Sequence, residues 1–209
     1  MPAISPIVFV VDDDVSVRES LELLIRHEGW HSETFSSADD FLKRSPTLIP
    51  SCLVLDVSLP GISGLELQRR IAAERADMPI IFITGYGDIP MTVRAMKAGA
   101  IEFLTKPFTN ETLVSAIQQA LERSRTALTE QEEMQKRRRS YSTLSPRERE
   151  VMMLVVSGML NKQAGAELGI SEITVKAHRG QVMQKMKAGS LADLVQIATK
   201  LGLERPPRA

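Results

Sequence analysis

The stretch IVFVVDDD at residues 7–14 decides the fold of this chain, because five apolar residues of strand length end on three acids. A second run, CLVLD at residues 52–56, also ends on an acid. Apolar runs of this length are typical of strands buried on both faces of a parallel sheet. The carboxyl ends of parallel strands meet at one edge of the sheet. Asp12, Asp13 and Asp56 are therefore predicted to lie close together.

Apolar runs alternate with amphipathic helical patterns through the first 122 residues. Further strands are predicted at residues 31–35, 80–83 and 101–104. Apolar residues repeat at helical spacing between Val17 and Ile25 and again between Leu113 and Leu121, which gives each helix one sheet-facing stripe. This alternation predicts a doubly wound α/β domain with five parallel strands and a ligand site at the carboxyl ends of the strands.

Polar residues also follow two other predicted strands, as Thr84 and Lys106. Carboxylates gathered at such an edge can bind a hard cation such as Mg²⁺, with Mn²⁺ as a substitute, and can offer one oxygen as a nucleophile. Thr84 and Lys106 could then stabilise phosphoryl oxygens. Each residue alone has a simpler explanation, and Asp14, just before a helical pattern, fits a helix N-cap. The coincidence of four strand ends favours a phosphorylation site with Asp56 as the nucleophile.

Composition separates the chain into two parts with opposite charge. Residues 1–122 hold 10 Lys and Arg against 17 Asp and Glu, a net charge of −7, whereas residues 123–209 hold 16 against 9, a net charge of +7. The basic part predicts a nucleic-acid partner. The single cysteine, Cys52, excludes a disulfide framework and a cysteine-based zinc site. No membrane span or secretory leader is predicted, so we expect a cytoplasmic protein.

The last part of the chain, residues 143–209, has an all-helical pattern. Ser145-Pro146 predicts a helix start, a short helix follows over residues 161–168, Ser171 caps a third helix that reaches about Met186, and a fourth runs over residues 191–201. Two short helices around a glycine-containing turn, the second rich in cationic and hydroxyl groups, are typical of a helix-turn-helix that binds DNA. Between the two domains, residues 123–142 are predicted to form a solvated helical linker.

Spacing within the third helix separates its buried side from its DNA side. Val175, Val182 and Met186 form the inward stripe. Arg179 shares this stripe, so two roles stay open for it: pairing with Glu148 or Glu150, or contacting DNA. Ala177 can touch a thymine methyl group. The residues predicted to contact DNA are Lys162, Ser171, Thr174, Lys176, Ala177, His178, Arg179 and Lys185.

The first domain resembles the receiver domain of two-component response regulators. The resemblance rests on the motifs VFVVDDD, LDVSLPG, TG and KPF, which begin at Val8, Leu55, Thr84 and Lys106. It implies that Asp56 is the phosphoacceptor and that Asp12, Asp13, Asp56 and the backbone carbonyl of Ser58 hold Mg²⁺. It also implies a cis peptide bond between Lys106 and Pro107. The family's switch aromatic maps onto Phe103, which as a phenylalanine has no hydroxyl group.

The last domain resembles the LuxR-type four-helix DNA-binding domain. The motifs are LSPREREV at residues 144–151, NKQ at residues 161–163 and TVKAHR at residues 174–179. Joined to this receiver, the chain looks most like the FixJ branch of response regulators. Two glycines depart from what is expected: Gly165 stands inside a helix, where it costs about 1 kcal/mol relative to alanine, and Gly180 removes a side chain from the recognition helix.

These features together predict a transcriptional regulator and not an enzyme. A sensor histidine kinase would phosphorylate Asp56, receivers would form a homodimer, and the paired helix-turn-helix domains would bind promoter DNA, where RNA polymerase is a further expected partner. Three alternatives are kept. The chain could bind DNA and regulate transcription without phosphorylation. Its helical domain could instead be an adaptor that binds a protein. Asp12 could also be the nucleophile of a haloacid-dehalogenase-like phosphatase, because residues 12–14 fit the Asp-x-Asp pattern of that family.

Overall fold

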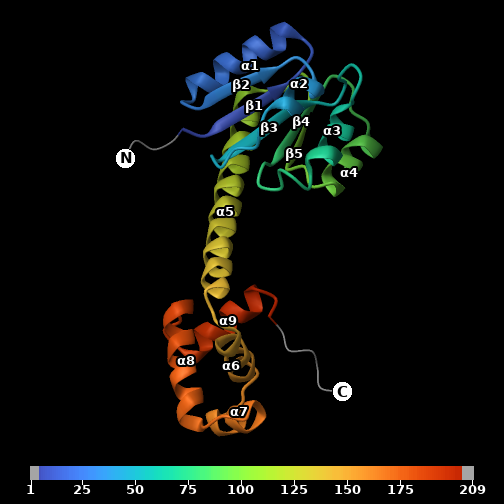
Figure 1. Ribbon diagram of the computed structural model, residues 1–209. Helices are drawn as coiled ribbons and strands as arrows, with labels where there is room; N and C mark the ends of the chain where they lie inside the picture. The colour runs from blue at the N-terminus through green and yellow to red at the C-terminus, as the bar shows by residue number, and fades with distance from the viewer. Residues whose placement is uncertain (1–4, 204–209) are drawn as a thin grey trace. The chain divides into compact units, whose positions relative to one another are not determined.

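A sheet of five parallel strands organises the first part of the chain (Figure 1). The strands lie side by side in the order β2-β1-β3-β4-β5. The connection from β2 to β3 therefore passes β1, and the later strands are added in sequence order on the other side of β1. This order confirms the predicted doubly wound α/β fold. The strands are β1 (Ile7–Val11), β2 (His31–Phe35), β3 (Ser51–Asp56), β4 (Ile80–Thr84) and β5 (Glu102–Thr105).

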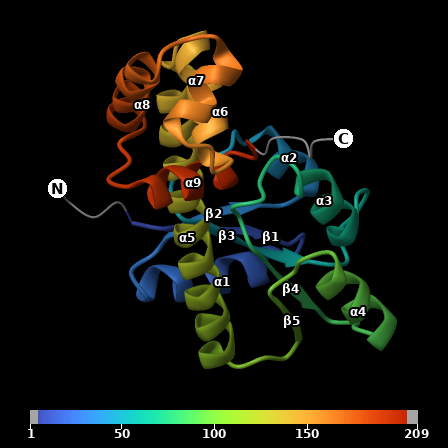
Figure 2. The ribbon, with the colours of Figure 1, turned by 90° about the horizontal axis from the view of Figure 1, so that it is seen from below.

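Helices cover both faces of this sheet, as Figures 1 and 2 show. The apolar core on one face includes α1 and α5, and the core on the other includes α2, α3 and α4. All residues of β1, β3 and β4 are buried as a result, which explains their nearly continuous apolar sequence. The helices are α1 (Val15–His27), α2 (Ala38–Lys43), α3 (Gly64–Ile71), α4 (Ile89–Lys97) and α5 (Asn110–Ser142).

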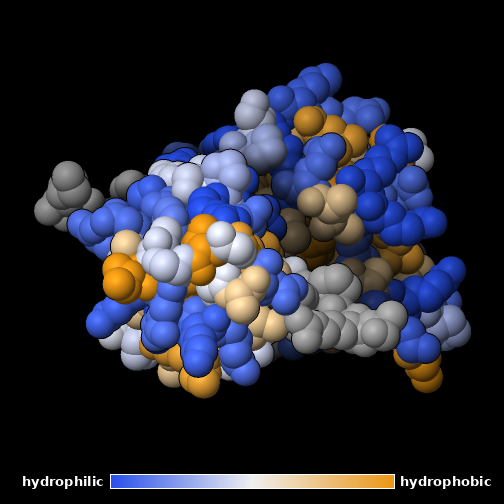
Figure 3. Space-filling view, turned by 60° about the horizontal axis from the view of Figure 1, so that its bottom comes forward, coloured by the Kyte–Doolittle hydropathy of each residue, from blue (hydrophilic) through white to orange (hydrophobic). Residues whose placement is uncertain are grey.

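The structure describes residues 5–203 and divides into two units, one that ends at Thr129 and one that begins at Glu130. The division falls within α5, which continues through the charged stretch as the sequence predicts. None of the helices between residues 5 and 203 combines the length and the apolar character that crossing a membrane requires. On the face seen in Figure 3, hydrophilic residues predominate and the hydrophobic ones form separate spots.

Four short helices complete the second unit, as predicted. One apolar cluster joins α6, α8 and α9 around Met152 and Val182, and another joins α6, α7 and the start of α8 around Val151 and Val175. The recognition helix α8 is therefore anchored in two separate places. The helices are α6 (Pro146–Val156), α7 (Asn161–Leu168), α8 (Glu172–Met186) and α9 (Leu191–Lys200).

The turn between α7 and α8 explains the glycine inside α7. A Cβ atom at Gly165 would lie 2.7 Å from the carbonyl oxygen of Ile170, which is closer than these atoms can approach. The carbonyl of Gly165 in turn accepts a hydrogen bond from the Ile170 amide at 3.0 Å. Gly169, at the C-cap of α7, has a φ of 65°, in the left-handed region that favours glycine. Glycine at position 165 lowers the helix propensity of α7, but it allows α7 and the turn before α8 to pack closely.

Candidate functional site

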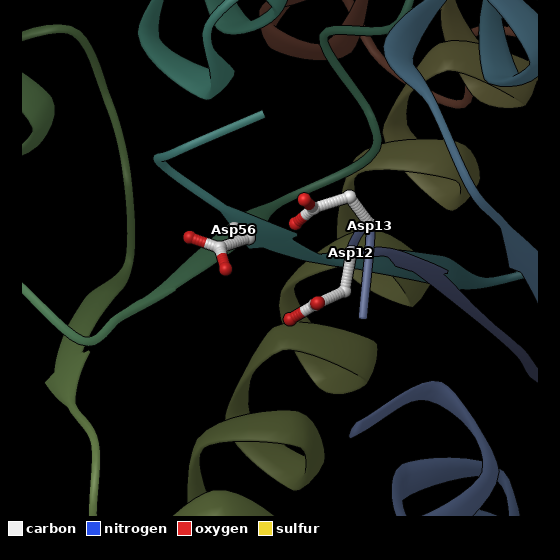
Figure 4. Close-up of side chains that lie close together, drawn as sticks. All are labelled: Asp12, Asp13 and Asp56. Atoms are coloured by element: carbon white, nitrogen blue, oxygen red, sulfur yellow. The ribbon is translucent and has the colours of Figure 1, made fainter. Parts of the chain in front are cut away.

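Three carboxylates meet at the carboxyl edge of the sheet. Asp12 follows β1, Asp13 comes next, and Asp56 ends the neighbouring strand β3. One carboxylate oxygen from each can be chosen so that all lie within 4.8 Å of one another, and Figure 4 shows the three side chains close together. Oxygen ligands at this spacing suit a hard divalent cation. The prediction that these acids lie close together is confirmed, and their arrangement is consistent with a divalent metal site.

Lys106 joins two of these acids by ion pairs. Its Nζ atom donates to Oδ2 of Asp12 at 2.8 Å and to Oδ2 of Asp56 at 2.9 Å. Lys106 follows β5 and precedes Pro107 through a cis peptide bond, as the resemblance implies. The lysine therefore reaches the acids from a strand that is not adjacent to either β1 or β3.

Burial and pairing act in opposite directions on these groups. Burial raises the pKa of the Asp12 carboxyl, although hydrogen bonds from Lys106 and from the Asp14 amide counteract it. Burial lowers the pKa of Lys106, but the hydrogen bonds and the charge attraction from Asp12 and Asp56 together outweigh this effect and leave the pKa above its ordinary value. The ammonium group is thus held in its charged form between the two acids.

Backbone groups fix how the acids point. The amide of Asp14 donates to Oδ1 of Asp12 and the amide of Ser58 donates to Oδ1 of Asp56, each at 2.9 Å. Asp14 also caps α1, because its carboxylate accepts from the Ser16 amide at 2.8 Å, which confirms the N-cap expected there. Asp12 and Asp56 therefore each keep one oxygen in a local turn and present the other to Lys106.

Two residues missed by the sequence patterns support this edge of the sheet. Arg18 donates from its guanidinium to the carbonyl oxygen of Asp12 at 2.6 Å. Gly64, the first residue of α3, packs so closely that a Cβ atom there would overlap the carbonyl oxygen of Asp56. Neither shows a spacing in the sequence that would connect it to the acids, because both contacts depend on how helices α1 and α3 approach the loops.

Thr84 and Phe103 take no part in these ion pairs, although the carbonyl oxygen of Thr84 accepts a hydrogen bond from the Lys106 amide at 2.7 Å. Thr84 is buried, and its Oγ1 atom accepts a hydrogen bond from the Tyr86 amide at 3.2 Å. Phe103 is half-buried, with its ring centroid 6.1 Å from that of Phe82. The roles predicted for Thr84 as a phosphoryl ligand and for Phe103 as a switch remain predictions.

The recognition helix of the second unit has the predicted buried stripe. Val175, Val182 and Met186 are buried. Ser171 caps the helix by accepting from the Thr174 amide at 3.1 Å, and the two hydroxyl groups also bond to each other at 2.8 Å. Of the residues predicted to contact DNA, four are exposed and four are half-buried. The exposed ones are Lys162, Ser171, Lys176 and Ala177, and the half-buried ones are Thr174, His178, Arg179 and Lys185.

The structure gives Glu148 a different partner from the one considered for it. Lys185, and not Arg179, donates to both carboxylate oxygens of Glu148, at 2.9 and 2.7 Å. Arg179 instead donates to Oδ1 of Asn161 at 3.2 Å, and Glu150 pairs with Arg147 at 2.7 Å. Lys185 was expected to face DNA, but its charge already serves an ion pair within the domain.

Protein families of known function match both units. The receiver domain of response regulators matches residues 8–118, and the LuxR family of bacterial regulatory proteins matches residues 142–198. This chain belongs to the response regulators. Its relatives include nodulation protein W of Bradyrhizobium diazoefficiens, 52% identical over 94% of this chain and 87% of the relative. The transcriptional regulatory protein FixJ of the same species is 39% identical over 94% and 96% of the two chains.

A solved structure of the response regulator StyR extends this similarity to three dimensions. It is 49% identical, with a TM-score of 0.83, and the match covers 94% of this chain and all of StyR. The chain is therefore a response regulator with a LuxR-type DNA-binding domain, and its acidic pocket serves phosphorylation. It is a transcription factor and not a classical enzyme, which decides against the phosphatase alternative.

Proposed function

We propose that Asp56 accepts the phosphoryl group and that a sensor histidine kinase donates it. A carboxylate oxygen of Asp56 would form a bond to phosphorus while the bond from phosphorus to the kinase's histidine nitrogen breaks, and that nitrogen would take up a proton from water, which leaves an acyl phosphate and a neutral imidazole. The observation that carries this proposal is the position of Asp56, whose Oδ2 atom is bound to Lys106 beside the carboxylates of Asp12 and Asp13.

The residues of the pocket suit Mg²⁺, with Mn²⁺ as a substitute. Asp12, Asp13, Asp56 and the backbone carbonyl of Ser58 would hold the ion, because hard cations prefer oxygen ligands. A bound divalent cation would neutralise charge on the transferred phosphoryl oxygens. Lys106 is already within hydrogen-bond reach of Asp56, so its ammonium could contact a phosphoryl oxygen without leaving the pocket.

A change at Thr84 would carry the signal away from Asp56. Its hydroxyl now accepts from Tyr86, and turning toward a phosphoryl oxygen would break that bond and move the loop before α4. Gly87 in this loop packs against the ring of Phe103, with only 3.0 Å between the Cε1 atom and the place of a Cβ. A shift of the loop would therefore change the space open to Phe103, which we propose as the switch residue.

The surface beside this switch suits a second receiver. Ile89, Val93 and Met96 on α4 are exposed although they are apolar, and such residues favour a protein interface. We propose that phosphorylation pairs two receivers through α4, β5 and the first turns of α5. Pairing would place two DNA-binding domains on adjacent half-sites of a promoter, where RNA polymerase is a further partner, in the cytoplasm.

We propose that three segments of the chain have separate roles. Residues 1–122 would form the receiver, residues 123–142 the helical linker, and residues 143–209 the DNA-binding domain. The predicted DNA contacts with the strongest support are Lys162, Ser171, Lys176 and Ala177, because they are exposed. Thr174, His178 and Arg179 would contribute through their exposed atoms.

Intact mass after incubation with acetyl phosphate and Mg²⁺ tests the proposal. Wild type should gain one phosphoryl group, Asp56→Asn should gain none, and DNA binding should strengthen only in the modified wild type. An adduct that survives Asp56→Asn would refute the assignment of the phosphoacceptor. DNA binding that is equal with and without the adduct would favour a regulator that acts independently of phosphorylation.

A further inference from the structure

One stripe of the recognition helix α8 is exposed along its whole length. It contains residues at spacings of three and four, which lie on one face of an α-helix. Apart from Glu172, the first residue of α8, the other positions of the helix are buried or half-buried, so this stripe is the outer face of the helix. Its members are Ile173, Lys176, Ala177, Gly180, Gln181 and Gln184.

Ile173 is the member of this stripe that has no explanation within the domain. It is the second residue of α8 and is 81% exposed, although a branched apolar side chain is normally buried. Scattered apolar residues on a surface need no explanation. Ile173, however, is followed on the same face by Ala177 and then by Gly180, so residues without a polar side chain recur along this face from the first turn to the middle of the helix.

We propose that Ile173 reads thymine in the major groove through the 5-methyl group of the base. The N-terminal residues of a recognition helix contact base edges, and thymine is the only base with a methyl group in the major groove. The hydroxyl groups of Ser171 and Thr174 bond to each other and cap the helix, so the first turn offers Ile173 as its outward-facing apolar group. This inference rests on sequence-specific DNA binding by the second unit.

Lys176, Ala177 and Gly180 support the same reading. Lys176 adds a cation beside Ile173 for a phosphate or a guanine edge. A Cβ atom at Gly180 would meet no other atom within 4 Å, so nothing in the fold requires a glycine there. The absent side chain would let the helix approach the base pairs closely enough for the methyl groups of Ile173 and Ala177 to touch them.

Selection from a pool of random DNA duplexes by the full-length, phosphorylated protein tests this inference. Wild type should enrich a motif in which at least one thymine becomes degenerate when Ile173→Ala is used instead. Replacing that thymine by uracil removes only the methyl group and should weaken wild-type binding about fourfold for each half-site. The same uracil should leave the affinity of Ile173→Ala unchanged, and Ile173→Val should retain part of the effect.

Gln184→Ala is the matched control, because Gln184 is exposed on the same stripe but near the end of α8. It should enrich the wild-type motif and keep the sensitivity to uracil. Equal sensitivity to uracil in wild type and Ile173→Ala would overturn the inference while leaving the proposed function intact. A wild-type protein that enriches no motif would overturn both.

Discussion

Replacing Lys185 by methionine should destabilise the second unit without removing a DNA contact. Lys185 pairs with Glu148, whose side chain is 7% exposed, while the lysine side chain is 34% exposed. Removing one partner of a fully buried pair costs about 3–5 kcal/mol. Solvent screening at the exposed lysine and the hydrogen bond that Ser145 still donates at 2.7 Å reduce this, so we expect about 2 kcal/mol.

Hydrogen exchange of the full-length protein, resolved by peptide, measures the stability of the second unit separately from that of the receiver. A loss of about 2 kcal/mol should speed exchange of α6 and α8 amides about 30-fold, while peptides from β1 and β3 should not change. Lys176→Met is the matched control, since Lys176 is exposed on the same helix. The control should leave exchange unchanged but lower the salt dependence of DNA binding by about 0.9 in the log–log slope for each subunit.

The pH dependence of this effect follows from Glu148. Lys185 and the amide of Ser145 hold the pKa of Glu148 below its ordinary value in the folded protein. A carboxyl whose folded pKa is lowered stabilises the fold above its unfolded pKa of about 4.3 and loses that contribution as the pH falls through the lower folded value. The difference between wild type and Lys185→Met should therefore shrink below about pH 4. Unchanged exchange in Lys185→Met together with a smaller salt slope would refute this reasoning.

Four further substitutions test the packing and charge of the two units. Lys106→Met leaves the acids of the pocket without their cation and should lower the stability of the receiver by about 2 kcal/mol, read from urea unfolding followed by Trp30 fluorescence; addition of Mg²⁺ should restore most of it. Gly64→Ala should cost about 2 kcal/mol by overlap with the adjoining strand end, in the same assay, whereas an unchanged midpoint would show that α3 can move away. Gly165→Ala should destabilise the second unit in thermal unfolding, although alanine is the better helix former, while Gly180→Ala, which meets no other atom, should stabilise it by about 0.5–1 kcal/mol.

The strands and the long amphipathic helices could be predicted from the sequence because their apolar patterns are strong. Strands at residues 7–11 and 31–35 and the helix at residues 161–168 were placed at the bounds that the structure has. Helices α2 and α3 were not, because both are short and, unlike the equally short α7, which ends at the turn residue Gly169, neither is followed by a glycine that marks its end. The sequence thus predicts elements that bury a long stripe and misses those held mainly by their neighbours.

The acids of the pocket could be predicted for a related reason. Their positions follow from strand ends, and parallel strands bring such ends together whatever the details of packing. The partner of Glu148 could not be found, since it lies 37 residues away and depends on how α6 crosses α8. Ile173 was passed over because an isoleucine within a helical pattern resembles a core residue until its exposure is known.

The two separate anchors of α8 have a consequence for how such regulators diversify. Val175 fastens the first half of the helix to one cluster, and Val182 and Met186 fasten the second half to another. The outward positions are free of both clusters, so selection can replace them with little effect on stability. A gene duplicate could acquire a new set of promoters by a few substitutions along one stripe, while its folding and its response to the kinase stay as they were.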